Sequence, residues 1–164
     1  MQTQNDLFIK MTLDLWNVYI SRTNKLVDAL TDEQLQNEVS PGRNSGVYLV
    51  GHLAAVHDAM LPLLGFGEKL FPEWENIFIK NPDKSGIEKP SITLIRENWK
   101  QVNEKLYSHF LKMNSEDWFK KHSAVSEEDF KKEPHRNKLN LVLNRTNHLS
   151  GHYGQMVFLN SKEE

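Results

Sequence analysis

Two histidines and a glutamine near the C-terminus have the spacing of a ligand group on one face of a helix. His148 and His152 are four residues apart, and Gln155 follows three residues later, in the stretch NHLSGHYGQM. At about 100° per residue, His152 lies about 40° from His148 around a helix, and Gln155 lies about 20° to the other side. Because imidazole nitrogens are the commonest side-chain ligands of transition metals, this spacing predicts part of a metal site.

A third histidine, His52, lies at the centre of the apolar stripe of a second predicted helix, over residues 45–64. Three imidazoles from two facing helices can hold a divalent metal and leave a position open for water or substrate, as catalytic zinc sites do. Each part has a plainer interpretation, since an i, i+4 histidine pair is often solvated and a lone core histidine is usually hydrogen-bonded. Because all three histidines are expected on helix faces that point into the bundle, we favour the metal-site interpretation over these plainer ones. The stripe around His52 consists of Tyr48, Leu49, Ala55, Val56, Ala59 and Leu63.

The remaining histidines fit a surface role better. His57 lies about 140° from His52 around the same helix, so we expect it to face outward or toward a partner chain. Three others fall on a helix flank or in polar connections, and we expect them at the surface: His109, His122 and His135.

Three further polar residues could belong to the site. Gln155 could hold a ligand or a bound water by a hydrogen bond, or it could be a buried amide that satisfies backbone groups. Tyr19 and Arg22 fall on or near the expected inner face of the first helix and could line a pocket, where an arginine would suit a carboxylate. Alternatively, the Arg22 stem packs while its head reaches solvent.

The elements that must position these residues are helices. Apolar residues recur at three- and four-residue spacing over 5–30, 45–64, 91–114 and 137–160, with short helical turns expected at 31–35 and within 115–132. We expect 65–90 to be an ordered loop with a helical turn, whose aromatic residues at 66–78 pack on the helices, with a lid or a dimer contact as alternatives. The predicted inner stripe of the first helix is Phe8, Met11, Leu15, Val18, Tyr19, Leu26 and Leu30.

This pattern predicts an all-α fold, a four-helix bundle with long connections between helices two and three and between helices three and four. The 164 residues, 38% of them hydrophobic, suit one domain over 1–164. A net charge of −2 disfavours binding to nucleic acid or to an anionic membrane. No run approaches about 18 apolar residues and no signal peptide is evident, so we expect a cytoplasmic protein. The absence of cysteine excludes disulfides and thiolate metal ligands.

Two motifs carry a resemblance to a known family. The stretches SGVYLVGHLAAV and RTNHLSGHYGQM resemble the DinB superfamily, including its YfiT-like metal-dependent hydrolases. The resemblance implies an up-down-down-up four-helix bundle whose metal is held by His52, His148 and His152, with Gln155 matching the glutamine of the family's His-x-Gly-Gln ending. It also implies nickel or zinc, and a homodimer. Tyr153 stands where the family often has arginine.

These observations together predict a metal-dependent enzyme that activates a water or a thiol on a small-molecule substrate, as a hydrolase or a thiol S-transferase. Characterised relatives include transferases and isomerases that use low-molecular-weight thiols. No acidic residue neighbours the histidines in the sequence, which disfavours peptide hydrolysis. The alternative is a non-catalytic metal-binding bundle, a dimeric stress-associated or structural protein. With four inward stripes assigned, we expect no long apolar face for a partner helix.

Overall fold

The computed structural model describes residues 3–160, which form helices and no strand, so the predicted all-α class is confirmed. Four helices are long: α1 (Gln4–Ala29), α3 (Gly46–Asp58), α6 (Ile92–Phe110) and α8 (Lys138–Met156). The predicted helix over 45–64 is divided, since α3 ends at Asp58. The short helices are α2 (Asp32–Gln36), α4 (Met60–Leu64), α5 (Trp74–Phe78), η1 (Asp117–Phe119), α7 (Glu127–Lys132) and η2 (Val157–Asn160).

Side chains at the helix starts fix where the elements begin. Each capping residue accepts a hydrogen bond from a backbone N–H of the first turn, which satisfies a donor that has no partner within the helix. Thr31 makes a capping box with Gln34 at the start of α2, within the helical turn predicted at 31–35. Gly65 ends α4 in the left-handed conformation, with φ of 80°. The long helices are capped by Thr3, Ser45, Ser91 and Asn137.

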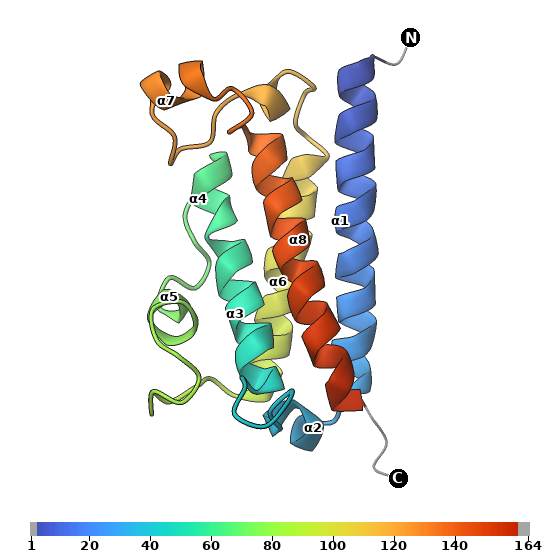
Figure 1. Cartoon of the computed structure of the whole chain (residues 1–164), viewed down its shortest axis with the longest axis vertical. Helices are drawn as coiled ribbons and strands as arrows, with labels where there is room; N and C mark the ends of the chain where they lie inside the picture. The colour runs from blue at the N-terminus through green and yellow to red at the C-terminus, as the bar shows by residue number, and fades with distance from the viewer. Residues whose placement is uncertain (1–2, 161–164) are drawn as a thin grey trace.

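The four long helices lie side by side (Figure 1). In that view α1 and α8 run downward and α3 and α6 run upward. The closest packing joins α3 to α6 and α1 to α8, and α3 also contacts α5 and α8. Short helices cover the ends, with α2 below and α7 above. Since α3 and α8 are neighbours with opposite directions, the two elements that carry His52 and His148 face each other.

Helix α3 is the centre of the core. Within Gly46–Asp58 every residue except His52 is buried. The stretch Gly46–Leu64 is long and apolar enough to cross a membrane, contrary to the expectation that no such run exists, but 78% of its window is buried inside the protein. This burial is what a core helix requires, because α3 packs against neighbours on all sides.

The predicted inner stripe of the first helix is wrong over its N-terminal half, whereas Tyr19 and Leu26 pack partly buried against the core and Leu30 is buried. Phe8 and Met11 are 57% and 58% exposed, and Leu15 and Val18 also face outward. The buried positions of α1 are Thr12, Trp16, Thr23 and Val27. Ile9, Leu13 and Ile20 complete the inward face, partly buried against the core. The apolar periodicity of α1 therefore marks an exposed apolar face, which also corrects the expectation that no such face remains.

His57 is a core residue, contrary to the prediction that it faces outward. Its side chain is fully buried and lies between Trp16 and Trp99, with ring centroids 4.7 and 5.2 Å away. Its Nδ1 is 2.7 Å from Oδ1 of Asn103, which accepts the hydrogen bond. Burial lowers the pKa of His57 to about 3, so the ring is neutral at physiological pH. The prediction failed because α3 is surrounded by packed elements on every face.

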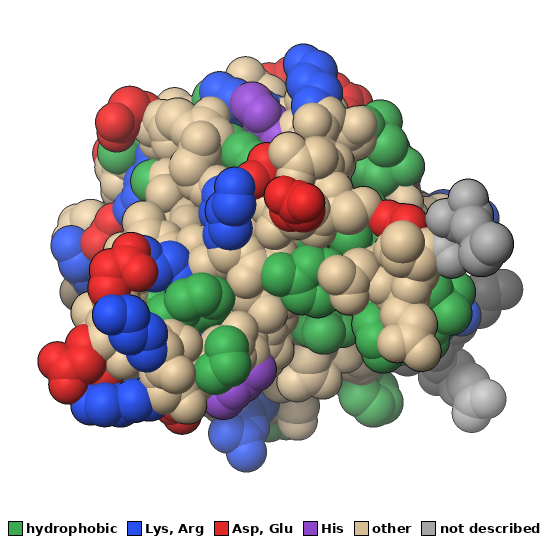
Figure 2. Space-filling view, turned by 90° about the horizontal axis from the view of Figure 1, so that it is seen from above, with side chains coloured by type: hydrophobic (Ala, Val, Ile, Leu, Met, Phe, Trp, Pro, Cys, Tyr) green, Lys and Arg blue, Asp and Glu red, His purple; other side chains and the backbone are tan. Residues whose placement is uncertain are grey.

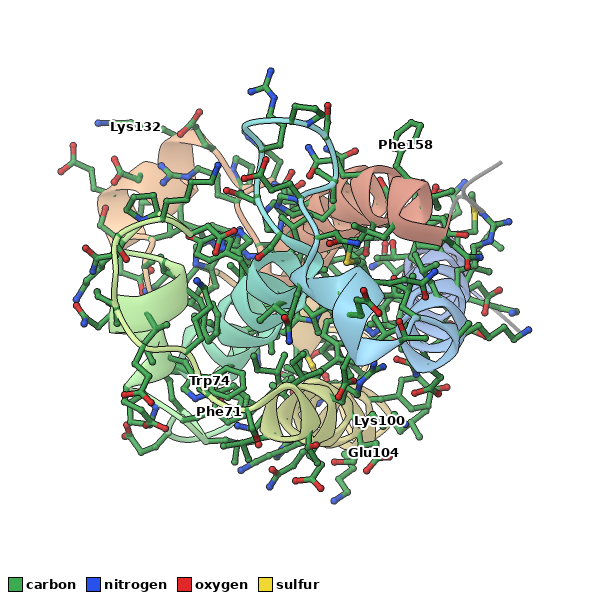
Figure 3. The ribbon with its side chains drawn as sticks, turned by 90° about the horizontal axis from the view of Figure 1, so that it is seen from below. Phe71, Trp74, Lys100, Glu104, Lys132 and Phe158 are labelled. Atoms are coloured by element: carbon green, nitrogen blue, oxygen red, sulfur yellow. The ribbon has the colours of Figure 1, made fainter. Side chains whose placement is uncertain are left out.

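The aromatic residues of 66–78 pack into the core, as the first of the three interpretations predicted. Phe71, Trp74 and Phe78 are at most 5% exposed, and Figure 3 shows Phe71 and Trp74 pointing inward beside α6. In the same view Phe158 points away from the helices. The segment at 66–78 therefore packs against α3 and forms part of the core.

Charged side chains of both signs are interspersed on the surface. Figure 2, which looks down on the end that carries α7, shows acidic and basic groups alternating on that face. Many are paired, as in the bridges between Lys132 and Glu128 and between Arg136 and Glu133. Surface pairs of this kind add little stability.

Candidate metal centre

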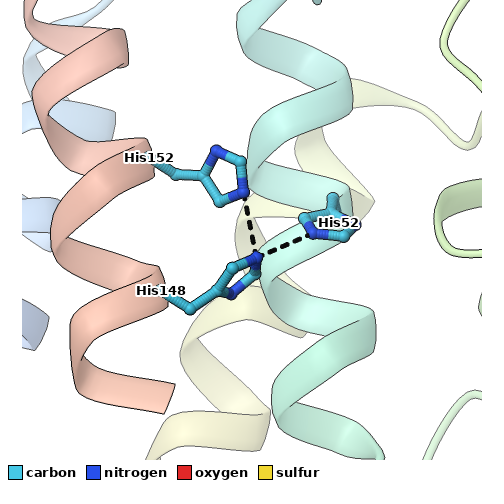
Figure 4. A group of neighbouring side chains, drawn as sticks. All are labelled: His52, His148 and His152. Carbon is cyan, nitrogen blue, oxygen red and sulfur yellow. Dashed lines mark hydrogen bonds between the residues drawn. The ribbon is translucent and has the colours of Figure 1, made fainter. Parts of the chain in front are cut away.

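Three imidazoles meet between α3 and α8 (Figure 4). Nε2 of His148 is 3.1 Å from Nε2 of His52 and 3.0 Å from Nε2 of His152. One nitrogen from each ring lies within 4.8 Å of the others. The structure therefore brings together the three histidines that the sequence singled out. Each is partly buried, so the group lies at the edge of the core.

The ring of His52 is held by a backbone carbonyl. Its Nδ1 is 2.7 Å from the oxygen of Phe78, which can only accept, so Nδ1 carries the proton and Nε2 presents its lone pair. The ring stacks on Tyr48 at an interplanar angle of 10°, and the Tyr48 hydroxyl shares its proton between the carbonyls of Asn81 and Phe78, 2.7 and 3.2 Å away. The last residue of α5 thus fixes both the tautomer and the direction of His52.

His152 is oriented in the same way by a side chain. Its Nδ1 donates to Oε1 of Gln155, 2.8 Å away, which leaves the lone pair of Nε2 free. Gln155 is exposed, so it is not the buried amide of the alternative interpretation. It holds a candidate ligand by a hydrogen bond, as the first interpretation proposed. Nδ1 of His148 is buried and has no hydrogen-bond partner among residues 3–160.

The residues fit a divalent transition metal. The lone pairs of His52 and His152 converge on Nε2 of His148, and a single N–H there cannot satisfy both. A cation would satisfy all three. The Nε2 separations of 3.0 and 3.1 Å are short enough for one ion, at a typical zinc-to-imidazole distance of about 2.1 Å, to contact both nitrogens of a pair. The donor set is all imidazole, which suits zinc, nickel, copper or iron.

Burial favours the neutral form of two of these imidazoles, His52 and His148. Desolvation lowers the pKa of His52, and it lowers the pKa of His148 to about 4. Neighbouring positive charge, including that of Arg145, contributes to both shifts after desolvation, which is the largest cause. Neutral rings are the form that binds metal, so His52 and His148 are ready to act as ligands at neutral pH.

Comparison of the sequence with models of protein families gives a match to the DinB superfamily over residues 18–156. The chain belongs to the DinB superfamily. The matched range contains all three histidines and Gln155, so the resemblance seen in the two motifs is confirmed. A search of curated proteins found no match.

This DinB protein departs from the expected site at three positions. Tyr153, where the family often has arginine, lies edge-on to Tyr19 with ring centroids 6.2 Å apart. Arg22 is exposed and lies over the Tyr19 ring, 5.6 Å from its centroid. Among residues 3–160, neither Tyr19 nor Arg22 lines the pocket that includes His52 and His148 or the one that includes His152. The alternative interpretation, in which the Arg22 head reaches solvent, therefore describes Arg22 better.

Two pockets open onto the histidines from different ends of the α3–α8 contact. One, of about 500 Å³, lies toward the C-terminal end of α3 and is lined by His52 and His148. The other, of about 570 Å³, lies beside the 39–44 loop and is lined by His152 and Gln155. Both have the size of small-molecule sites. A group held by the three histidines would therefore be reachable from two sides.

Sequence reasoning missed three charged residues in the first of these pockets: Lys69, Glu75 and Arg145. Arg145 precedes His148 by three residues, a spacing that places it on the same helix face and could have revealed it. Glu75 and Lys69 come from the 65–90 segment, whose fold no periodicity predicts. Hydrogen bonds from Lys69 and Lys80 lower the pKa of Glu75 to about 2, which makes it a weak base.

Proposed function

We propose that this DinB protein is a metal-dependent enzyme that uses His52, His148 and His152 to activate a small thiol for transfer to a second substrate. The observation that carries the proposal is the convergence of three imidazole nitrogens that line two separate pockets, His52 and His148 in one and His152 in the other. Nickel or zinc is the metal we propose, held in a four-helix bundle of DinB type formed by α1, α3, α6 and α8. We expect the enzyme to act in the cytoplasm, without nucleic acid or membrane.

A divalent cation at this site would lower the pKa of a thiol or a water and stabilise negative charge that develops on the substrate. The chain's own residues orient the ligands, through the Phe78 carbonyl and the Gln155 amide. The two pockets allow two reactants to approach the same centre from different sides. This arrangement supports transfer between two substrates.

Hydrolysis is the second candidate, with water in place of the thiol. It needs a general base near the attacking water. Glu75 is the acidic residue that shares a pocket with His52 and His148, but its pairing with Lys69 and Lys80 keeps it ionised and weakly basic. The non-catalytic bundle is less well supported, because a structural site is expected to be closed, whereas these histidines line open pockets.

Cobalt substitution tests the proposed chemistry. We expect the Co(II)-loaded protein to develop a sulfur-to-cobalt charge-transfer band in the near ultraviolet when 2-mercaptoethanol is added, because the three imidazoles leave room for a thiol. The oxygen analogue ethylene glycol, added at the same concentration, is the control and should produce no such band. A Co(II) spectrum that 2-mercaptoethanol leaves unchanged would rule out thiol activation at this site.

We also propose a homodimer formed through the exposed apolar face of α1, defined as Leu7, Phe8, Met11, Leu15 and Val18. These five side chains are 43–58% exposed and follow one side of a long helix. Contiguous apolar patches of this kind mark interaction sites, and a helix can pair with its own copy about a two-fold axis.

Charge on this face should separate the dimer. We expect Met11→Glu combined with Leu15→Glu to convert the protein from dimer to monomer in size-exclusion chromatography with light scattering. The matched control is Leu94→Glu, at an exposed leucine of α6, which should leave the dimer intact. A wild-type protein that is monomeric at all concentrations contradicts the proposal.

A further inference from the structure

Arg145 is a cation without a counterion beside the candidate metal centre. It lies on α8 between Leu141 and His148 and is partly buried. It makes no hydrogen bond or ion pair with any residue in 3–160, and its Nε atom is buried without a partner. The other charged groups in the same pocket, Lys69 and Glu75, are paired with each other. Arg145 is therefore the unpaired charge of this pocket.

An unpaired guanidinium at this position is costly. Removing a charged group from water without a partner is unfavourable, and burial accordingly lowers the pKa of Arg145. Arginine nevertheless remains protonated in proteins. A divalent cation on His52 and His148, which line the same pocket, would add a second positive charge. The structure therefore gathers positive charge here, and among residues 3–160 no anion pairs with Arg145, since Glu75 pairs with Lys69 and Lys80.

We infer that Arg145 is the anchor of a substrate subsite for a small organic carboxylate whose apolar body fills the pocket lined by His52 and His148. The guanidinium fork matches a carboxylate through two parallel hydrogen bonds. The inference deepens the proposed function and rests on it, since it assigns the second substrate of that site.

The walls of the pocket favour a carboxylate on an apolar body over a phosphate. Val56, Ala59, Pro62, Leu63 and Ile79 line the volume of about 500 Å³ next to Arg145. These side chains suit a hydrocarbon group of a few carbons. A phosphate would need more donors than one guanidinium, and Lys69, the other cation of the pocket, already pairs with Glu75. The geometry thus selects one negative charge followed by an apolar group.

Titration calorimetry with hexanoate tests the subsite, with hexanamide and inorganic phosphate as comparison probes. We expect hexanoate to bind both the metal-free and the Zn(II)-loaded protein, and to bind more tightly than either comparison probe. Arg145→Met keeps the packing of the stem and removes the fork, and it should weaken hexanoate binding at least about tenfold. Arg145→Lys keeps the charge without the fork and should recover only part of this loss. Arg22→Met is the matched control and should leave binding unchanged.

The outcomes separate this inference from the proposed function. Hexanoate binding to metal-free protein that Arg145→Met abolishes supports the subsite even if the histidines bind no zinc. Zinc binding without any hexanoate binding overturns the subsite and leaves the metal centre standing. Equal binding of hexanamide, or tighter binding of phosphate, also overturns it. Circular dichroism shows whether Arg145→Met is folded, and if it is not, Arg145→Lys decides by the same measurement.

Discussion

Replacing both His148 and His152 by alanine is expected to abolish metal binding. Zinc sites with four protein ligands contribute about 10–16 kcal/mol, or about 3 kcal/mol for each ligand, so the loss of two ligands should weaken binding by about ten-thousandfold. His52 alone, whose Nε2 lies 3.1 Å from that of His148, cannot hold a metal with useful affinity. Elemental analysis of purified, dialysed protein measures the result directly.

The control for this variant is a histidine outside the centre. His135 is exposed and lies in the connection before α8, so His135→Ala should retain the full metal content. The double variant should also keep its fold, because the two side chains lie at the edge of the core and not within it. Metal content that is equal in wild-type and double variant would refute the assigned ligands, provided that circular dichroism shows both proteins folded.

Gly51→Ala is expected to be strongly destabilising although it adds only one methyl group. A Cβ at residue 51 would lie 2.3 Å from Cε1 of Phe78 and within 2.7 Å of two further atoms of that ring. Phe78 is fully buried, so its ring cannot swing into solvent. Overpacking of this kind costs about 1–3 kcal/mol. Chemical denaturation should show this loss in the free energy of unfolding.

The same substitution should also weaken metal binding. The carbonyl of Phe78 accepts a hydrogen bond from the Nδ1–H of His52, so a shift of α5 moves the group that orients this ligand. Loss of such a partner typically costs 10- to 100-fold in metal affinity, and we expect about tenfold.

Gly151→Ala is the matched control, since Gly151 also lies within a helix but has open space where the Cβ would be. There alanine should stabilise the protein by about 0.5–1 kcal/mol. Equal stability changes in the two variants would contradict the close packing of α3 against α5.

The candidate site was largely predictable because its residues lie on regular helices. A helix fixes the angle between side chains, so His148 and His152 can be placed on one face by counting, and His52 follows from the apolar stripe around it. The caps Thr31, Ser45 and Ser91 likewise mark helix starts through local hydrogen bonds. Such features depend on neighbours within four residues along the chain.

The remaining features depend on contacts between distant segments. The Phe78 carbonyl reaches His52 across 26 positions, and a backbone oxygen has no signature in a sequence. His57 was assigned to the surface because a helix was assumed to have a polar side, which α3 lacks. The N-terminal half of the α1 stripe, from Phe8 to Val18, is predicted in the core but is exposed. Apolar periodicity shows that a helix has an apolar face and does not say which element covers that face.

The burial of α3 bears on how substrate range can diverge in a protein of this kind. Every residue of Gly46–Asp58 other than His52 is packed, so a change there threatens folding before it alters the pocket. Helix α8 and the segments at 39–44 and 65–80 combine pocket-lining and exposed positions, and they can vary at smaller cost. Selection for new substrates should therefore leave the sequence of α3 nearly constant, and substitutions should accumulate in α8 and in the segments at 39–44 and 65–80.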